Sequence, residues 1–437
     1  MEKVQKRVEH ILYLFLVNVT RYYYSSCDLV LLLLPRETDL EKQLRSLPSS
    51  SYHSRRIELL CKSPRRFVFR LFLWFLLLSF FSFFLVLGLK LNFPTPATTV
   101  SSPSTATKQS FEKLCATFND SQLLSEIKDL RVMVAVNLKD VEHLLPVFSH
   151  QILRLREYLK PENIFVSMYE SGSCDRSQVL LQELEAKLTE HEIQHRFVFG
   201  NRTRKKGENR IKFLAEIRNQ VLSVLDENIF EPDYILFSND VFFCTEHLIR
   251  LLYRSTKGGD MVCALDFNEE YHFYDTWVAR DSHGMPLRHS RDCSVFSSES
   301  DVRLCRQGMA VPMHCCWNGL VVFRSSIFTR KGIRFRHVED EESECAGSEC
   351  TLLCNDLWKN GFRSIYVDPG VRVAYEARIF RDLEVEKPVL NEKAFSVMKE
   401  QQLVPFQPPD KFFCCPLPPQ SSRDDPNLNV AYFASVL

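Results

Sequence analysis

The sequence predicts an α/β protein: a parallel, Rossmann-like sheet with helices on both faces, behind an N-terminal transmembrane helix. Three observations predict this arrangement. Apolar runs alternate with amphipathic helical patterns between residues 132 and 240, an uncharged apolar segment lies near the N-terminus, and a stretch rich in Pro, Ser and Thr separates the two. The chain has 437 residues, enough for one large domain or two ordinary ones.

The membrane-spanning segment is predicted over residues 67–91. Leu71–Leu89 carries no charged side chain, and its helical length of about 28 Å matches the hydrocarbon core of a bilayer. A buried core helix rarely stays apolar on every face over such a length. A cleaved signal peptide would start closer to the N-terminus and end in a small-residue cleavage site.

The charges flanking this segment predict its orientation. Between Arg36 and Arg70 lie nine Lys or Arg residues against four acidic ones, whereas only Lys90 and Lys108 are basic between residues 90 and 110. Basic flanks stay cytoplasmic, so residues 1–66 form a cytoplasmic tail and the C-terminal bulk is lumenal, in a single-pass type II arrangement. The apolar runs at 11–17 and 29–34 are interpreted as part of this tail, with a second span or an interfacial helix as the alternatives.

The residues beyond the span suit the secretory lumen. Thirteen of the fifteen cysteines lie there, where disulfides persist, and each cysteine of the adjacent pairs 315–316 and 414–415 is expected to bond elsewhere. Zinc is disfavoured because no CxxC pair has a matching second half. Asn119 and Asn201 begin sequons for N-glycosylation. Residues 92–110 form a Pro/Ser/Thr stem, 111–377 the lumenal globular domain, and 378–437 a Pro-rich extension that packs on the domain or trails from it.

Strands and helices alternate inside the globular region. Strands are predicted at 132–138, 164–169, 196–199 and 234–237, and helices at 142–159, 177–191 and 208–225. This order predicts a parallel sheet. Ligands of open α/β sheets bind at the carboxyl ends of the strands, which singles out Asn137, Glu170, Asp175 and Asp240.

Asp240 carries the most specific chemistry of these, because it ends the apolar strand ILFSND at 235–240. A carboxylate there can hold a hard divalent ion such as Mn²⁺ or Mg²⁺, which bridges phosphate oxygens. The alternative is a cap for the helix expected near Cys244. The preceding helix has the pattern A-x-x-R-N at 215–219, and its Arg218 can pair with a phosphate or a nearby carboxylate. A solvated helix face is the alternative for Arg218.

These two motifs resemble the nucleotide-binding half of GT-A fold glycosyltransferases, and a longer series of motifs resembles the fungal capsule-associated α-1,3-mannosyltransferase family. The resemblance covers residues 130–376. It comprises the strand with Asn137, SMYESGSCD at 167–175, FLAEIRNQVL at 213–222, ILFSNDVFFC at 235–244, CALDF at 263–267, FYDTWVARD at 273–281, CWNGLVVF at 316–323 and SECTLLCNDLW at 348–358.

The resemblance implies a Golgi enzyme that transfers mannose from GDP-mannose, with retention of configuration, to the 3-hydroxyl of a mannose-containing glycan, using Mn²⁺ or Mg²⁺. Asp240 matches the metal-binding aspartate of the family. Asn239 is its neighbour in a shortened D-x-D motif, since Phe242 occupies the second acidic position. In such a transfer either the leaving phosphate takes the acceptor proton or an aspartate forms a covalent intermediate.

The candidate site residues divide by role. The catalytic candidates are Asp240, Asp266 and Glu349, although Glu349 could instead sit favourably at a helix N-terminus. The donor-binding candidates are Asn137, Glu170, Asp175, Arg218 and Asn239. The acceptor-binding candidates are Asp275, Arg280, Asp281 and Trp317, where Trp317 either stacks on a sugar or belongs to the core.

Two other functions remain compatible with these residues. The same fold could use another nucleotide sugar, or the single acid at the metal position could indicate a non-catalytic lumenal protein that binds glycans or acts as a scaffold. The balance of 55 basic and 55 acidic residues argues against nucleic-acid binding. With 13 glycines and no glycine-rich phosphate loop, P-loop and nicotinamide-binding proteins lack a motif. The sequence is compatible with an oligomer as well as a monomer.

Overall fold

The computed structural model describes residues 111, 114–115, 120–205, 207–338, 344–386, 392–415 and 432–435. The chain divides into two compact units, residues 1–100 and 101–437, and all described residues belong to the second. Within them, no helix is both long enough and apolar enough to cross a bilayer. The predicted tail, membrane span and stem, and the sequon at Asn119, lie outside the described residues.

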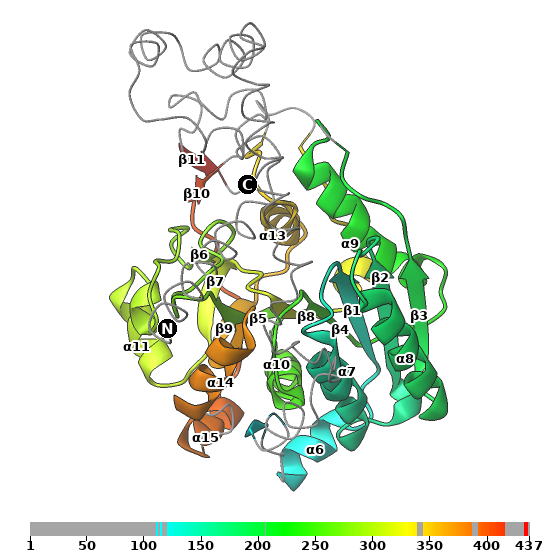
Figure 1. Cartoon of the computed structure of the whole chain (residues 1–437). Coiled ribbons are helices and arrows are strands. Elements are labelled where there is room, and N and C mark those ends of the chain that lie inside the picture. The colour runs from blue at the N-terminus through cyan, green and yellow to red at the C-terminus, as the bar shows by residue number, and fades with distance from the viewer. Residues whose placement is uncertain are drawn as a thin grey trace, which may run out of the picture. The chain divides into compact units, whose positions relative to one another are not determined.

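One large mixed sheet forms the centre of the described unit (Figure 1). Its strand order is β3-β2-β1-β4-β8-β5-β9-β7-β6. The strands are β1 (Val132–Leu138), β2 (Ile164–Glu170), β3 (Gln194–Phe199), β4 (Tyr234–Ser238), β5 (Met261–Phe267), β6 (Arg280–Asp281), β7 (Val311–Cys315), β8 (Leu320–Arg324) and β9 (Ile365–Ala374). A separate antiparallel ribbon pairs β10 (Lys411–Cys414) with β11 (Tyr432–Ser435).

The parallel arrangement predicted for the strands between residues 132 and 237 is confirmed for β1 to β4, whereas the later strands make the sheet mixed. Strand β1 pairs in parallel with β2 and β4, and β2 with β3. Strand β8 instead runs antiparallel to both of its neighbours, β4 and β5, and β7 runs antiparallel to β9 and β6. Strands β7 and β8 thus run in the same direction, opposite to β4, β5 and β9, and β5 and β9 lie between them in the sheet.

The helices pack around this sheet in two groups. Helix α7 contacts both α8 and α10, whereas α9 lies across β1 and β2 and contacts α12 and α13. The helices are α6 (Ser121–Ile127), α7 (Leu145–Arg154), α8 (Ser177–Glu190), α9 (Arg210–Asp226), α10 (Thr245–Thr256), α11 (Glu299–Arg306), α12 (Ser326–Thr329), α13 (Glu349–Lys359), α14 (Ala377–Glu386) and α15 (Glu392–Glu400). Helix α7 is shorter than the predicted 142–159 because Pro146 starts it and a 3₁₀ turn, Leu155–Glu157, follows it.

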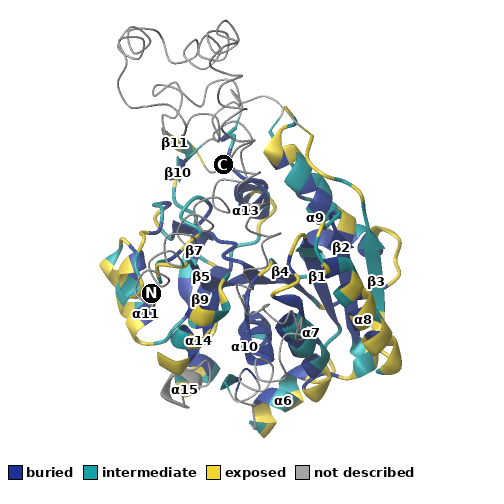
Figure 2. Ribbon diagram, in the orientation of Figure 1, coloured by how far each residue is buried: buried dark blue, intermediate teal, exposed yellow. Residues whose placement is uncertain are grey.

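Helix α10 is the centre of the core, although it carries several charged residues. Figure 2 shows it buried, whereas α8 exposes one face to solvent. Two of its arginines, Arg250 and Arg254, hold the fully buried Asp368 of β9 through N–O distances of 2.9 Å. The two cations keep the pKa of Asp368 below its usual range, against the effect of burial. This charge cluster ties α10 to β9.

The segment after α14 packs on the same core. The Arg254 guanidinium donates to the Met398 carbonyl at 3.3 Å and to the Gln401 side chain at 2.7 Å. Phe412 and Cys414 are buried as well. The described part of the predicted C-terminal extension therefore lies against the domain rather than trailing from it.

Five disulfides cross-link the described residues. They join Cys115 to Cys244, Cys263 to Cys316, Cys293 to Cys305, Cys315 to Cys354, and Cys345 to Cys414. The prediction that adjacent cysteines bond elsewhere is confirmed for Cys315, Cys316 and Cys414, whereas Cys415 forms no disulfide. Three cysteines in the described part remain free: Cys174, Cys350 and Cys415.

We expect Asp368→Asn to destabilise the protein by about 3–5 kcal/mol, because the substitution leaves two buried guanidinium groups without their counter-charge. Urea denaturation of the purified protein measures this loss. Asp129→Asn is the matched control: Asp129 pairs with Lys160 at 2.6 Å, but both side chains are more than half exposed, so the change should cost far less stability than Asp368→Asn. Equal losses for the two variants would contradict the role of the buried cluster.

Candidate active site

Polar residues gather where the parallel strands end. Strands β1, β2, β4, β5 and β9 run in the same direction, so their carboxyl ends lie at one edge of the sheet. Antiparallel β8 begins at this edge, with Leu320 opposite Ser238, and Phe242 pairs with Ala374 at the end of β9. The residues just after β4, just before β8 and just after β9 therefore meet, as expected for the ligand crevice of an α/β sheet.

Asn239 forms hydrogen bonds to several elements at this edge of the sheet. Its backbone N–H donates to the Gly319 carbonyl at 2.8 Å. Its side-chain Oδ1 accepts hydrogen bonds from Arg218 Nη1 at 3.3 Å and from Trp317 Nε1 at 3.1 Å. Three elements, β4, α9 and the loop before β8, are thereby fixed to one amide.

The loop before β8 needs an unusual backbone to make this contact. Asn318 and Gly319 both have positive φ, at 52° and 74°. A Cβ atom at Gly319 would lie 2.9 Å from a Val241 methyl group, so a larger residue would push β4 and β8 apart. The Asn318 side chain fixes the turn by donating to the Ala264 carbonyl at 2.7 Å.

Arg218 forms a buried ion pair with Glu349. Its Nε donates to Glu349 Oε1 at 2.9 Å, and the two side chains are only 12% and 2% exposed. The guanidinium also lies 4.2 Å from the centre of the Trp317 ring, within range for a cation–π interaction. Sequence analysis proposed Arg218 as a donor-binding residue and Glu349 as a catalytic residue, and the structure shows them bound to each other.

Asp240 follows this cluster and is open to solvent. Its carboxylate is nevertheless surrounded by much of the crevice, and this partial loss of hydration raises the pKa of Asp240, although His143 and Arg218 act in the opposite direction. In the described part of the chain, Asp240 belongs to no cluster of three metal-ligating side chains. It offers one carboxylate, which suits an ion that takes its other ligands from phosphates and water.

Asp266 and Asp275 form a second acidic pair, in which Asp266 is fully buried and Asp275 is half-buried. The backbone N–H of Asp275 donates to Asp266 Oδ1 at 3.2 Å, and the Tyr375 hydroxyl donates to Asp266 Oδ2 at 3.2 Å. Burial, and then the charge of Asp275, raise the pKa of Asp266 well above its usual range, and burial also raises the pKa of Asp275. Asp275 accepts from the Asn318 and Val278 amides at 3.3 Å, so it joins the loop after β5 to the turn before β8.

Tyr375 is the functional candidate that sequence analysis missed. It follows β9 directly, and its hydroxyl is hydrogen-bonded to Asp266. It also lies close enough to Asn239 and Asp240 that both influence its pKa. Burial is the main cause of the raised pKa of this phenol, which stays protonated and donates its hydrogen bond. The rule that found Asp240, a polar residue at the end of a strand, would have found Tyr375 had β9 been recognised.

Three donor-side predictions lie at the expected edge but are occupied by local contacts. Asn137 Nδ2 donates to the Ile217 carbonyl at 2.9 Å, one residue before Arg218. Glu170 accepts from the Ser173 amide at 2.5 Å and from Gln178 at 2.8 Å. The carboxylate of Asp175 caps α8 and accepts from the Glu142 amide at 3.0 Å.

Two acceptor-side predictions face the protein interior. Arg280 donates to the carbonyls of Phe413, Thr276 and Ala279, and burial lowers its pKa to about 10. Asp281 is fully buried and accepts from the His283 and Met285 amides at 2.9 Å. Both belong to β6, the last strand of the sheet. Sequence composition cannot tell such internal hydrogen bonding from ligand binding.

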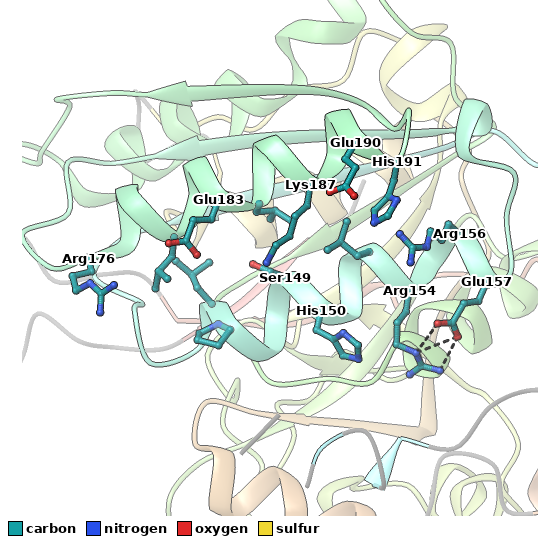
Figure 3. A pocket seen from close by; sticks show the side chains of 15 residues that line it. Ser149, His150, Arg154, Arg156, Glu157, Arg176, Glu183, Lys187, Glu190 and His191 are labelled. Atoms are coloured by element: carbon teal, nitrogen blue, oxygen red, sulfur yellow. Dashed lines mark hydrogen bonds and ion pairs between the residues drawn. The ribbon is translucent and has the colours of Figure 1, made fainter. Parts of the chain in front are cut away.

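A separate hollow of about 570 Å³ lies between α7 and α8 (Figure 3). Figure 3 shows Lys187 of α8 extending toward Ser149 of α7, and Arg154 bound to Glu157. Arg154 also pairs with the buried Glu246 at 2.7 Å. The hollow shares no lining residue with the strand-end cluster and has mixed charge, so we place the active site at the strand ends instead.

Comparison with known proteins identifies the family of this site. Residues 131–356, more than half of the chain, match the family described as Cryptococcal mannosyltransferase 1. The chain belongs to this family. The resemblance inferred from the sequence motifs is confirmed, and the matched residues include Arg218, Asn239, Asp240 and Glu349.

The chain is also similar to one curated protein and to several solved structures. The alpha-1,3-mannosyltransferase CMT1 of Cryptococcus neoformans var. neoformans serotype D is 28% identical over 389 residues, 77% of this chain and 83% of that protein. Among solved structures, the mannosyltransferase PcManGT from Pyrobaculum calidifontis in complex with GDP-Man and Mn²⁺ matches with a TM-score of 0.36 and 13% identity, over 64% of this chain and 65% of that one. S. aureus TarS 1-349 in complex with UDP matches with a TM-score of 0.33 and 15% identity, over 58% and 63%. The chain thus spans slightly less than two thirds of both structures.

We expect Glu349→Gln and Arg218→Met each to destabilise the protein by about 3–5 kcal/mol, since each leaves one buried charge unpaired. The double variant should lose less than the sum of the two single losses, because it leaves neither charge behind. Urea unfolding of the four proteins measures this coupling. Glu227→Gln, which breaks the exposed pair between Arg196 and Glu227, should change little. Additive losses would show that the pair is not coupled.

Proposed function

We propose that this chain is a retaining α-1,3-mannosyltransferase with a GT-A catalytic domain. It moves mannose from GDP-mannose to the 3-hydroxyl of a mannose-containing glycan and depends on Mn²⁺ or Mg²⁺. The family assignment and a relative named as an α-1,3-mannosyltransferase support the reaction. The observation that carries the site is the solvent-open carboxylate of Asp240 at the carboxyl end of β4, next to the buried cluster of Arg218, Asn239 and Trp317.

The charges of the crevice explain why a metal is needed. Arg218 is neutralised by Glu349, and three further acids, Asp240, Asp266 and Asp275, lie at the same edge of the sheet. A diphosphate entering this crevice meets no unpaired arginine or lysine among these residues. Asp240 would hold the divalent ion, which would neutralise the charge that builds on the leaving diphosphate. One carboxylate is sufficient because the donor phosphates supply further oxygen ligands.

The positions of the acids favour a transfer in which the leaving phosphate accepts the proton of the acceptor hydroxyl. Both carboxylate oxygens of Asp266 accept hydrogen bonds, and the side chain is fully buried. Glu349 is held by Arg218 and Ser348. Neither acid can reach a sugar carbon without breaking these bonds, which argues against a covalent intermediate on either. Both acids then act by positioning Tyr375 and Arg218.

We further propose that the protein is a single-pass type II membrane protein of the Golgi, with its catalytic domain in the lumen. The apolar segment at residues 71–89 and its basic flank support the topology. Five disulfides in the described residues suit an oxidising compartment. The Asn201 side chain is exposed in a loop, where an oligosaccharide could be attached.

We expect Asp240→Asn to reduce mannosyl transfer at least about a hundredfold with an intact fold, because the variant keeps the shape of the side chain and loses the charge that holds the metal. A GDP-release assay on the purified protein measures the effect. A chelator should silence the wild type and Mn²⁺ should restore it. Asp226→Asn, at the exposed end of α9, should leave the rate unchanged. Normal activity of Asp240→Asn, or an unaffected wild type in chelator, would reject this metal site.

The lumenal placement predicts glycosylation at Asn201 and Asn119. Endoglycosidase treatment of the expressed protein should increase its gel mobility, and Asn201→Gln should remove part of that shift. In intact microsomes the C-terminal domain should resist added protease until detergent is present. Digestion without detergent would contradict the topology.

A further inference from the structure

An exposed tyrosine lies beside the proposed metal-binding edge. Tyr274 is 54% exposed, one of few large apolar side chains so open in the described residues. Its backbone N–H donates to the Asp266 carbonyl at 3.0 Å, which anchors the backbone of Tyr274 at the end of β5, two positions from β4 in the sheet. On one side the ring packs on Tyr375, with 4.9 Å between ring centres. This leaves other parts of the ring open to solvent.

The ring beneath it is fixed to the catalytic residues. Tyr375 donates its hydroxyl hydrogen bond to Asp266 and adjoins Asn239 and Asp240. Tyr274 is therefore separated from the proposed metal ligand by a single aromatic side chain. The carboxylate of Asp275, the next residue, accepts from the Val278 amide at 3.3 Å and fixes the loop that presents the ring.

Trp317 cannot serve as the stacking surface that the sequence suggested. It is only 3% exposed, and the Arg218 guanidinium lies over its ring at 4.2 Å. The edges of Phe237 and Phe335 enclose it further. Tyr274, by contrast, is exposed, and it packs on Tyr375 beside Asp240.

We propose that Tyr274, positioned by Tyr375, is the platform on which a neutral pyranose ring of the acceptor glycan stacks, an assignment that rests on the proposed transferase function. A pyranose has an apolar C–H face that packs on an aromatic ring, and its hydroxyl groups suit the neighbouring carboxylates. Stacking here holds the acceptor next to the donor edge.

Steady-state kinetics of the full-length protein in detergent test the platform, with GDP-mannose as donor and methyl α-mannoside or a mannobiose as acceptor. Tyr274→Ala should raise the KM for the acceptor about tenfold, as expected for the loss of one aromatic contact. GDP release without acceptor should change much less. Tyr274→Phe should keep the KM within about twofold of the wild type, since the ring remains.

Phe433→Ala is the matched control. Phe433 is also half exposed and packs on another aromatic ring, Phe413, but it belongs to the separate ribbon of β10 and β11. Its loss should not change the acceptor KM. An unchanged KM in Tyr274→Ala, or a Tyr274→Phe variant as weak as Tyr274→Ala, would overturn the platform.

Failure of the proposed reaction can be told apart from failure of the platform. If the wild type releases no GDP from GDP-mannose, the proposed function is wrong, and the platform is then judged by binding. Saturation-transfer NMR should detect methyl α-mannoside on the wild type and on Tyr274→Phe, but not on Tyr274→Ala. If the NMR saturation-transfer signal of methyl α-mannoside is equally strong with Tyr274→Ala and with the wild type, or is absent with the wild type, the platform is rejected.

Discussion

The buried ion pair between Arg218 and Glu349 is the interaction on which the geometry of the crevice depends. It joins the middle of α9 to the first residue of α13, and through Asn239 and Trp317 it reaches β4 and the loop before β8. A charge that is taken out of water is tolerated only where its partners are complete. Each of these elements is therefore held in one position by the cost of leaving the guanidinium unsatisfied.

This arrangement separates two tasks that sequence analysis had assigned to the same residues. Arg218 and Glu349 set the shape of the wall, and Asp240 alone presents a solvent-open charge in front of it. Asp266 and Asp275 have a different role, because they fix the loops that carry Tyr274 and Tyr375. Burial raises the pKa values of both acids. The wall of the crevice formed by Trp317 and Asn239 is thus held in place by internal contacts, whereas the edge at Asp240, where a donor would enter, is open to solvent.

Much of the donor side could be predicted because local pattern and topology agree there. The βαβ alternation gives β1 to β4, and the end of β4 gives Asn239 and Asp240. The part of the sheet that follows β4 in the chain could not be predicted in the same way. Strand β9 contains Asp368, Pro369 and Gly370, so its sequence does not resemble an apolar strand. The pairing of β9 with β5 also shifts register at these residues. Tyr375, which follows β9, was therefore missed. Arg280 and Asp281 were over-interpreted because internal hydrogen bonding and ligand binding use the same side chains.

The place of β9 in the sheet has a consequence for how the chain is made. It lies between β5 and β7, although the ribosome produces both neighbours first. Until residues 365–374 emerge, β5 and β7 each present an unpaired edge, and such edges invite pairing with other chains. The arrival of β9 closes this gap and in the same event delivers Tyr375 to Asp266.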